Sequence, residues 1–488
     1  MTEATGPVIE NFGGNIRFRP QYSYTPATEE ELLAILDRHC EGTVRVVGAR
    51  HSWNEGMTTD DVVVSLARFT SVLLETDAEG RVWATVGGGC RIKTLLRELK
   101  DRADVTLPSM GLITEQTIAG AISTGTHGSG RHSLSHYMAE VRTAAYDPVT
   151  GRATIHRWFG GDELRAARCA VGCMGVVVAV RFRCVPRYVI AESMEFHTDI
   201  ATVLGRERDF PLQQFYLIPH SWSWYSQERR VPEGPAGRRR SLRAPLYRLY
   251  WFVWLDVGFH LAIKLLAAGL RSRRLVVGFY RRLLRHLIVR PRAVADWSEN
   301  QLVMKHELFR HLEIELFVPR SRVAEAAGFV REVLDLCAGT TDSLSDELAD
   351  RLEPLGLADG LRRLTGGYTH HYPICFRRVL PDDTLISMAS GTAEPWYAIS
   401  FITYVEPRAA FLALADFLAA AMGRLFGARP HWGKYLPATT PPVELLYPEV
   451  ATFRQACRGI DPRGVFLNPF TRRVLGFADD CAGQARER

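Results

Sequence analysis

The stretch Gln116-Thr117-Ile118-Ala119-Gly120-Ala121-Ile122-Ser123-Thr124-Gly125-Thr126-His127-Gly128-Ser129-Gly130 decides the fold class of this chain. Together with Gly111 it holds five glycines among small and hydroxyl side chains, so the backbone can approach a ligand closely. Residues 111–130 contain neither Lys nor Arg, and an anionic ligand here would therefore be held mainly by backbone N–H groups. The stretch predicts a loop whose backbone lies close to a ligand.

Short strands and helices alternate on both sides of this loop. Thr28-Glu29-Glu30-Glu31 forms a capping box that predicts a helix to about Cys40. Apolar runs predict buried strands, and helical spacing predicts a second helix. The predicted elements are strands at Val44–Val47, Val62–Leu66, Val82–Val86 and Gly175–Cys184, and a helix at Ile92–Leu99. This order predicts an α/β lobe in the first third of the chain.

Longer strands begin after residue 190 and alternate with helices. The predicted strands are Gln213–Ile218, Leu312–Val318, Ile374–Leu380 and Trp396–Val405, and the predicted helices are Ser321–Leu336 and Ala409–Ala421. Strands with covering helices in this order favour an α+β lobe built on an antiparallel sheet. We expect residues of about 228–300 to form an arginine-rich helical insertion in this lobe and the last dozen residues to form a frayed tail.

Charge is concentrated in that insertion. The chain of 488 residues has a formal net charge of +6, yet Glu228 to Arg292 alone carries +13. Aromatic residues accompany the arginines at helical spacing, without any nucleic-acid reader fold, so nucleic acid is not an expected partner. Two interpretations remain for the insertion: a helix that lies in the headgroup layer of a membrane, or a helix pair packed on its own lobe with solvated arginines.

Cysteine usage and the N-terminal residues predict a cytoplasmic protein. The nine cysteines form no CxxC pair, which favours reduced thiols, and the first residues lack the pattern of a secretory signal. Arg248, Asp256, His260 and Lys264 interrupt the most apolar stretch, so we do not expect it to span a membrane.

Several well-known motifs are absent. Gly427 to Lys434 lacks the spacing of a phosphate-binding P-loop, and His306 and His311 are one residue too far apart for a HExxH zinc helix. Neither a GxGxxG between strand and helix nor a GxSxG turn occurs. We therefore expect no metal site, no nicotinamide Rossmann domain and no serine nucleophile.

Five segments resemble one flavoprotein family in the right order. They are Val47–Asn54 (VGARHSWN), Gln116–Gly130, Gly172–Val177 (GCMGVV), Arg429–Lys434 (RPHWGK) and Asp461–Asn468 (DPRGVFLN). The chain resembles the vanillyl-alcohol-oxidase type of FAD protein, and most of all its aldonolactone and alditol oxidase branch. The resemblance covers the whole chain except residues of about 190–310.

The resemblance implies an α+β protein with a FAD-binding domain of two α/β subdomains, the type named after p-cresol methylhydroxylase (PCMH). This domain would span residues 1–188, and an α+β substrate or cap domain with an antiparallel sheet would span residues 189–430. Residues 431–475 would return to the flavin, and residues 476–488 would form the tail.

The resemblance also assigns residues to the FAD. His51 matches the histidine that some relatives bond covalently to the flavin, a reaction that needs a neutral imidazole. The expected cofactor contacts are Gly48, Ala49, Arg50, His51, Ser52, Gly111, Thr117, Gly120, Ser123, Thr124, Gly125, Thr126, His127, Gly128, Gly175, Val176, Val177 and Lys434.

The substrate side departs from the family pattern. Lys434 and Arg377 match the cations that the branch places beside the flavin, whereas the glutamate of the branch's Glu-x-Arg strand is Cys375 here. A neutral thiol is a poor replacement for a carboxylate. Glu313 and Glu315, which share a face of another predicted strand, are the alternative carboxylates. The catalytic candidates are Arg377, Lys434, Glu313 and Cys375.

These residues imply an oxidoreductase that moves a hydride from a CH–OH carbon to flavin N5, with O2 as acceptor. The family default is an aldonolactone or alditol, but the lost polar positions favour a less polar or a sugar- or lipid-linked alcohol. The alternatives are a dehydrogenase or reductase with another electron carrier, and a membrane-associated flavin-binding protein without turnover.

Overall fold

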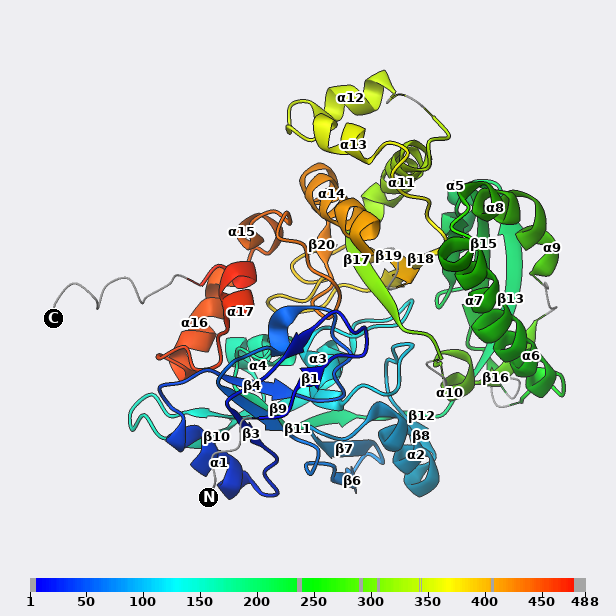
Figure 1. Ribbon diagram of the computed structural model, residues 1–488. Coiled ribbons are helices and arrows are strands. Elements are labelled where there is room, and N and C mark those ends of the chain that lie inside the picture. The colour runs from blue at the N-terminus through cyan, green and yellow to red at the C-terminus, as the bar shows by residue number, and fades with distance from the viewer. Residues whose placement is uncertain are drawn as a thin grey trace.

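The computed structural model describes residues 6–234, 239–288, 293–304, 308–341, 343, 345–404 and 408–477. Its first lobe is built on two sheets (Figure 1). A parallel sheet has the order β3 (Tyr22–Tyr24), β5 (Val62–Ser65) and β4 (Val44–Val47). An antiparallel sheet has the order β10 (Ala153–Trp158), β9 (Met138–Tyr146), β11 (Val176–Arg183), β7 (Val82–Gly87) and β6 (Val72–Thr76).

Helices of this lobe begin where the sequence predicts. The predicted capping residue Thr28 accepts a hydrogen bond from Glu31 N at 3.2 Å and starts α1 (Glu29–Arg38). The predicted second helix is α2 (Ile92–Ala103), and the glycine-rich stretch contains the short helix α3 (Ile118–Ser123). The smaller elements are β1 (Ile9–Glu10), β2 (Arg17–Phe18), β8 (Val105–Thr106), β12 (Val185–Pro186) and α4 (Gly161–Arg168).

The second lobe contains an eight-stranded sheet whose paired strands are antiparallel. Its order is β16 (Val294–Trp297), β13 (Val189–His197), β15 (Ser223–Arg230), β14 (Gln214–Ile218), β18 (Ile374–Val379), β19 (Trp396–Tyr404), β17 (His311–Pro319) and β20 (Arg429–Pro430). The four strands predicted from the sequence are the central members β14, β18, β19 and β17. Other helices of this lobe are α5 (Ile200–Gly205), α10 (Ser298–Gln301), α12 (Asp346–Leu352) and α13 (Ala358–Leu364).

The two faces of this sheet have different neighbours. The predicted helices α11 (Val323–Ala338) and α14 (Arg408–Phe426) share a buried hydrophobic core with one face. Residues of the opposite face, among them Tyr225 and Tyr404, pack with a helical hairpin that spans Ala244–Leu287. The central strands expose this second face toward the first lobe, and that is where the cavity described below lies.

The C-terminal helices return to the first lobe. Helices α15 (Val443–Leu446), α16 (Val450–Ile460) and α17 (Pro469–Leu475) bury residues in one core with the two sheets of that lobe. In Figure 1 α16 and α17 lie beside α4 and β4, and all three helices lie far from the hairpin. The boundaries 188, 430 and 475 stay predictions. Of the predicted tail 476–488, Phe477 packs in the core of the first lobe, and residues 478–488 lie outside the described residues.

The helical insertion is shorter than predicted. Glu228–Arg230 end β15, and Val294–Trp297 form the edge strand β16, so residues at both ends of the predicted range 228–300 belong to the sheet. Arg229, counted with the basic insertion, is buried and donates to Glu192 at 2.6 Å. The basic residues of this range therefore differ in their surroundings. Arg229 forms a buried ion pair in the sheet, whereas those of the hairpin, such as Lys264 and Arg271, are exposed. The hairpin itself consists of one long helix, Ala244–Gly269, and a second helical segment from Arg273 to Leu287.

A buried arginine links three distant segments around the cavity. Arg45 on β4 is 4% exposed. Its guanidinium donates to Gly56 O at 2.7 Å, to Val171 O at 2.9 Å and to Phe466 O. Each carbonyl belongs to a different loop, so one side chain satisfies three buried acceptors that would otherwise face an apolar core.

We predict that Arg45→Met lowers the free energy of unfolding by at least about 3 kcal/mol, because each orphaned buried acceptor costs about 1–3 kcal/mol. Chemical denaturation followed by intrinsic fluorescence measures the loss. Arg68→Met is the matched control, since Arg68 is exposed and its replacement should change stability by less than about 0.5 kcal/mol. Equal stability of the two variants would contradict the assigned role of Arg45.

Candidate active site

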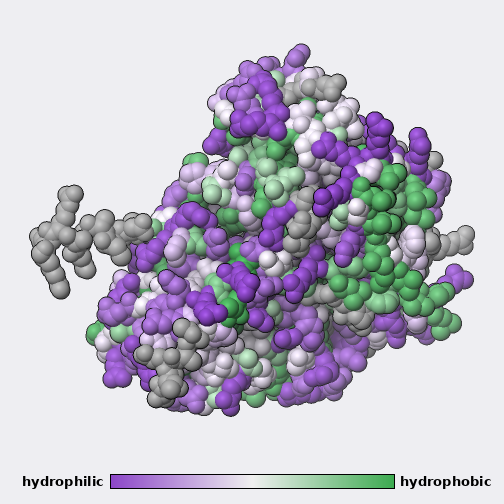
Figure 2. Space-filling view, viewed as in Figure 1, coloured by the Kyte–Doolittle hydropathy of each residue, from purple (hydrophilic) through white to green (hydrophobic). Residues whose placement is uncertain are grey.

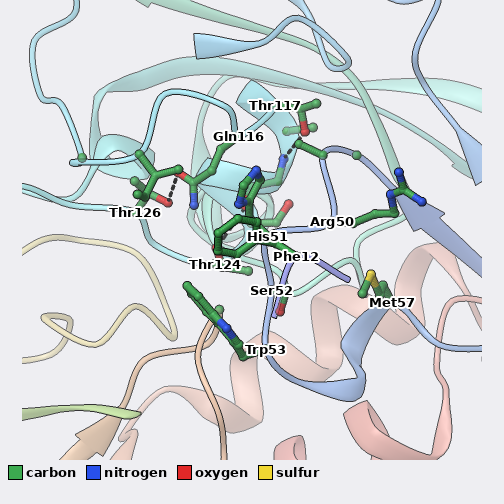
Figure 3. A pocket seen from close by; sticks show the side chains of 18 of the residues that line it. Phe12, Arg50, His51, Ser52, Trp53, Met57, Gln116, Thr117, Thr124 and Thr126 are labelled. Atoms are coloured by element: carbon green, nitrogen blue, oxygen red, sulfur yellow. Dashed lines mark hydrogen bonds between the residues drawn. The ribbon is translucent and has the colours of Figure 1, made fainter. Parts of the chain in front are cut away.

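A cavity of about 590 Å³ lies between the two lobes. Loops of the first lobe form one side, and strands β17, β18 and β19 of the second lobe form another. Figure 3 shows the first-lobe side, where His51 and Phe12 lie between Thr126 and Arg50, with Thr124 close to them and Trp53 below. Nine glycines line the cavity, so much of its wall is bare backbone.

The loop of His51 is held in an unusual backbone conformation. Arg50 has a φ of +60°, in the left-handed region that side chains other than glycine seldom adopt. Such strain is concentrated at functional sites. The His51 ring lies 5.0 Å from the ring of Phe12, between the two centroids. Burial lowers the pKa of His51 to about 4, so at neutral pH the imidazole is uncharged and able to act as a nucleophile.

The glycine-rich loop approaches the His51 loop closely. A Cβ atom on Gly48 would lie 2.3 Å from Thr117 Oγ1, so only glycine fits there. Thr117 caps α3 by accepting from Gly120 N, and Thr126 Oγ1 donates to Gln116 Oε1 at 3.2 Å (Figure 3). Local hydrogen bonds therefore hold the two halves of this loop around one end of the cavity.

Most of the predicted cofactor residues line the cavity. Those that do so are Gly48, Ala49, Arg50, His51, Ser52, Gly111, Thr117, Gly120, Ser123, Thr124, Thr126, His127, Gly175, Val177 and Lys434. Gly125, Gly128 and Val176 are not among the lining residues. Gly128 lies against the backbone of an earlier segment, since a Cβ there would meet Met110 O at 2.4 Å. Val176 precedes Val177 on a strand, so its side chain points to the opposite face.

The segment Arg429–Lys434 joins the two lobes. Backbone bonds from His431 N to Glu315 O and from Tyr435 N to Glu313 O fasten it to β17. On its other side, Trp53 N donates to Gly433 O at 3.1 Å. Lys434 is thereby fixed at the cavity wall, where its Nζ lies 2.5 Å from Glu313 Oε2 and 4.5 Å from the centroid of the Trp53 ring.

The carboxylate missing from the Arg377 strand is supplied from two strands away. Cys375 on β18 pairs with Ser400 on β19, and Ser400 pairs with Glu315 on β17, so the three residues form one row across the sheet. Glu315 Oε1 lies 3.5 Å from Arg377 Nη1 and 3.5 Å from His127 Nε2. One row further along β17, Glu313 accepts from Ser400 Oγ at 2.6 Å.

Electrostatics divide this row into charged and neutral groups. Burial disfavours the Glu315 carboxylate, but the neighbouring His127 and Lys434 hold its pKa well below the usual range. Burial likewise opposes the charge of Arg377, and Cys375 and the two glutamates nevertheless raise the pKa of its guanidinium. Burial raises the pKa of the Cys375 thiol, and Arg377 does not offset it. Cys375 is thus a neutral thiol, and it is not among the residues that line the cavity.

Two histidines at the cavity wall were not selected from the sequence. His431 lies in the quoted segment Arg429–Lys434, and its ring centroid is 5.5 Å from that of His127. Burial lowers the pKa of His431 to about 3 and also lowers the pKa of His311, so both are neutral at neutral pH. The matched segment Arg429–Lys434 contains His431, so this residue could be predicted from the sequence. The sequence pattern relates His311 only to a zinc motif, and its position at the start of β17 depends on the tertiary fold.

His127, Glu315 and His431 also form a cluster whose ligand atoms lie within 4.8 Å of one another. By distance these three buried groups could hold a metal ion. The Arg377 guanidinium lies 3.5 Å from Glu315 and would compete with a metal ion for this carboxylate. Repulsion between the guanidinium and a metal cation also disfavours metal binding here. The expectation of no metal stays a prediction.

The cavity fits FAD in its chemistry. Bare backbone at Gly48, Gly111 and Gly120 permits close approach of a pyrophosphate, and Arg50 adds positive charge at the same end. At the sheet end, Lys434 and Arg377 place two cations where a reduced flavin would gain negative charge.

Sequence comparisons match both lobes. A profile of FAD binding domains matches residues 20–147, and a profile described as D-arabinono-1,4-lactone oxidase matches residues 180–474. The long-chain alcohol oxidase of an uncultured marine euryarchaeote is 49% identical over 474 residues, which cover 97% of this chain and 98% of the relative. The alditol oxidase of a Streptomyces species is 26% identical over 472 residues, covering 96% and 99%. The L-gulonolactone oxidase of Mus musculus is 24% identical over 477 residues, covering 96% and 98%.

A solved structure has the same fold. Cholesterol oxidase from B. sterolicum superimposes with a TM-score of 0.73 at 14% sequence identity, over 96% of each chain. The predicted α+β class with a PCMH-type FAD fold is confirmed.

We predict that Cys375→Ser slows anaerobic flavin reduction by an oxidisable alcohol by less than about tenfold, because a neutral buried thiol contributes no base. Arg377→Met, one row away on the same strand, is the control and should slow reduction by about 10²–10³. Stopped-flow absorbance of the bound flavin measures both rates. A loss beyond about 10² in Cys375→Ser would assign a chemical role to the thiol.

Proposed function

The chain belongs to the D-arabinono-1,4-lactone oxidase family of FAD proteins, and within that family we propose that it oxidises long-chain primary alcohols to aldehydes. It is an FAD-dependent oxidoreductase that acts on CH–OH groups. The proposal concerns the substrate class, the acceptor, the attachment of the flavin and the contact with a membrane.

One observation supports a long apolar substrate. Arg377, Glu313 and Glu315 crowd one region of the cavity wall, and their charges are largely satisfied by one another and by Lys434. The second-lobe wall beyond them is mainly hydrophobic and aromatic, with Leu308, Phe309, Tyr372 and Ile402. A polyol or sugar lactone needs polar partners along its whole length. An alcohol with a hydrocarbon tail needs them only at its head.

Each residue near the hydroxyl end of the substrate has a distinct role. Bound FAD supplies the hydride acceptor, N5 of its ring. Arg377 and Lys434 favour the added negative charge, and Glu313, which lines the cavity, accepts the proton of the substrate hydroxyl. The substrate carbon loses a hydride and its oxygen loses a proton, which yields the aldehyde. Dioxygen then takes two electrons and two protons and leaves as hydrogen peroxide.

Covalent attachment of the flavin to His51 is the second part of the proposal. The neutral imidazole, the left-handed residue before it and its place in the Arg50-His51-Ser52 sequence support a fixed nucleophile. Linkage would hold the ring in one orientation relative to the substrate.

The third part is peripheral contact with a membrane through the hairpin Ala244–Leu287. The helices Ala244–Gly269 and Arg408–Phe426 are both long and apolar enough to cross a membrane. The second is α14, a core helix that is 61% buried over its most apolar window, whereas the first is only 11% buried. Because Phe259 and Ile263 of the first helix pack on the sheet, the helix would lie along the surface of a membrane.

We expect dodecanol to reduce the bound flavin most efficiently in an anaerobic panel with butanol, xylitol and L-gulono-1,4-lactone. Its kcat/KM should exceed that of butanol by at least about tenfold, because each buried methylene improves binding about fourfold. Admission of air should then restore the oxidised spectrum. Faster reduction by xylitol or the lactone would contradict the substrate class, and a spectrum that air leaves unchanged would contradict dioxygen as acceptor.

We also predict that acid precipitation leaves yellow, fluorescent flavin in the protein pellet of the wild type. His51→Ala should release all flavin into the supernatant, because no other bond would hold it. His39→Ala, a half-buried histidine outside the cavity, is the control and should retain the flavin. Free flavin in the wild-type supernatant would contradict covalent attachment.

A further inference from the structure

The cavity extends past the charged groups toward the helical hairpin. Successive residues on one face of β19 lead in this direction: Ser400 at the charged row, then Ile402, then Tyr404. At about 3.3 Å per residue, Ser400 and Tyr404 are about 13 Å apart along the strand. The Tyr404 hydroxyl donates to the carbonyl of His260, a hairpin residue that itself lines the cavity.

Aromatic side chains line the slot between hairpin and sheet. His260 stacks on Phe309 with ring centroids 4.9 Å apart and an angle of 5°, and its centroid lies 5.6 Å from that of Tyr372. Leu308, which is 51% exposed, also lines the cavity and marks its outer end. Asp256 adds one acidic group beside His260. We call this slot, formed by Asp256, His260, Leu308, Phe309, Tyr372 and Ile402, the tail corridor.

The same hairpin has an exposed apolar outer face. Phe259 and Ile263 point inward and are 8% and 0% exposed, whereas Leu261 and Leu265 are 52% and 58% exposed. Further large hydrophobic residues of the hairpin with at least 48% exposure are Leu246, Leu249, Val253, Leu270, Leu275 and Leu283, and Leu242 just before it is also exposed. Figure 2 shows hydrophobic residues gathered over the region of α6 to α8 (Ala244–Gly278). Patches of this kind on a soluble surface mark an interaction site.

Basic residues accompany this apolar face. Lys264, Arg271, Arg273, Arg274, Arg281 and Arg282 are all exposed on the hairpin. An apolar helical face flanked by basic side chains matches an anionic lipid surface, where each basic residue adds attraction. A second copy of the chain would bring the same positive charge against itself, so self-association through this face is disfavoured.

We propose that the tail corridor binds the hydrocarbon tail of the substrate and opens onto the lipid that the hairpin contacts. The alcohol passes from the bilayer, along the corridor, until its hydroxyl reaches Glu313 and Arg377. This inference rests on the proposed function, since it assumes a long-chain substrate. It adds the site that binds the tail and the direction from which the substrate enters.

Ile402→Trp tests the corridor because an indole at this position fills the space of several methylene groups. The ratio of kcat/KM for dodecanol to that for butanol should fall at least about tenfold, since each methylene left in water costs about fourfold. Ile402→Val keeps the corridor open and should retain the wild-type ratio. An unchanged ratio in Ile402→Trp, in an enzyme that prefers dodecanol, would overturn the corridor.

Binding of radiolabelled dodecanoate gives a readout that needs no turnover. This fatty acid has the tail but no hydride to give, so equilibrium dialysis with the holoenzyme measures binding without turnover. Dodecanoate held on the apolar outer face of the hairpin is common to the wild type and both variants, so the difference between these proteins reports the tail site. The wild type and Ile402→Val should bind it, and Ile402→Trp should bind it at least about tenfold more weakly. If the wild type binds dodecanoate but oxidises no alcohol, the proposed function fails while the corridor stands. If the wild type and the two variants bind it equally, the corridor fails.

The lipid entrance is tested by the double variant Leu261→Glu, Leu265→Glu. The wild type should sediment with phosphatidylserine vesicles at low salt, and the double variant should remain in the supernatant. The ratio of rates on hexadecanol dissolved in those vesicles to rates on hexanol in buffer should fall about tenfold. Leu445→Glu is the control, since Leu445 is 77% exposed on α15, remote from the hairpin, and should behave like the wild type. A wild type that stays in the supernatant, or a double variant with the wild-type ratio, would overturn the entrance.

Discussion

The buried guanidinium of Arg45 is the constraint on which the cavity depends. It binds carbonyls of Gly56, Val171 and Phe466, which belong to the His51 region, the segment before β11 and the C-terminal segment. Val171 itself has a φ of +51°, a strained value for a β-branched residue, and its carbonyl is fixed by this arginine. This charge is costly to bury, and the three carbonyl dipoles together with the nearby Asp461 carboxyl supply the compensation. These hydrogen bonds hold the three segments together and so fix the shape of the flavin end of the cavity.

At the other end, the sheet arranges charges so that they satisfy one another. Glu315 lies between Arg377 and His127, and Glu313 lies between Lys434 and Ser400. These groups are nearly dehydrated, and their mutual contacts fix their positions before any substrate arrives. The same face of the sheet becomes apolar toward the hairpin. Polar chemistry and apolar binding therefore occupy successive positions along one face of the strands.

The sequence predicted local elements well because their signals are local. The capped helix after Thr28, the strand around Arg45 and the four central strands of the second lobe follow from periodicity and capping. The contact between Glu315 and Arg377 was beyond such reasoning, since it depends on the order of three strands and on their register. The limits of the insertion were wrong for a related reason: Arg229 looks like a surface residue until the fold places Glu192 beside it. His311 likewise becomes a cavity residue only through the sheet.

The segment Arg429–Lys434 pairs with β17 and supports the His51 loop, although nearly four hundred residues separate it from that loop. During synthesis the His51 loop leaves the ribosome early and Lys434 late, and domains generally form in the order of their emergence. The first lobe must therefore persist for most of translation with its flavin end open and its C-terminal support missing. Cofactor capture becomes a late event in the life of the chain, because a nascent fragment that stops before residue 429 lacks the segment that ties β17 to the His51 loop.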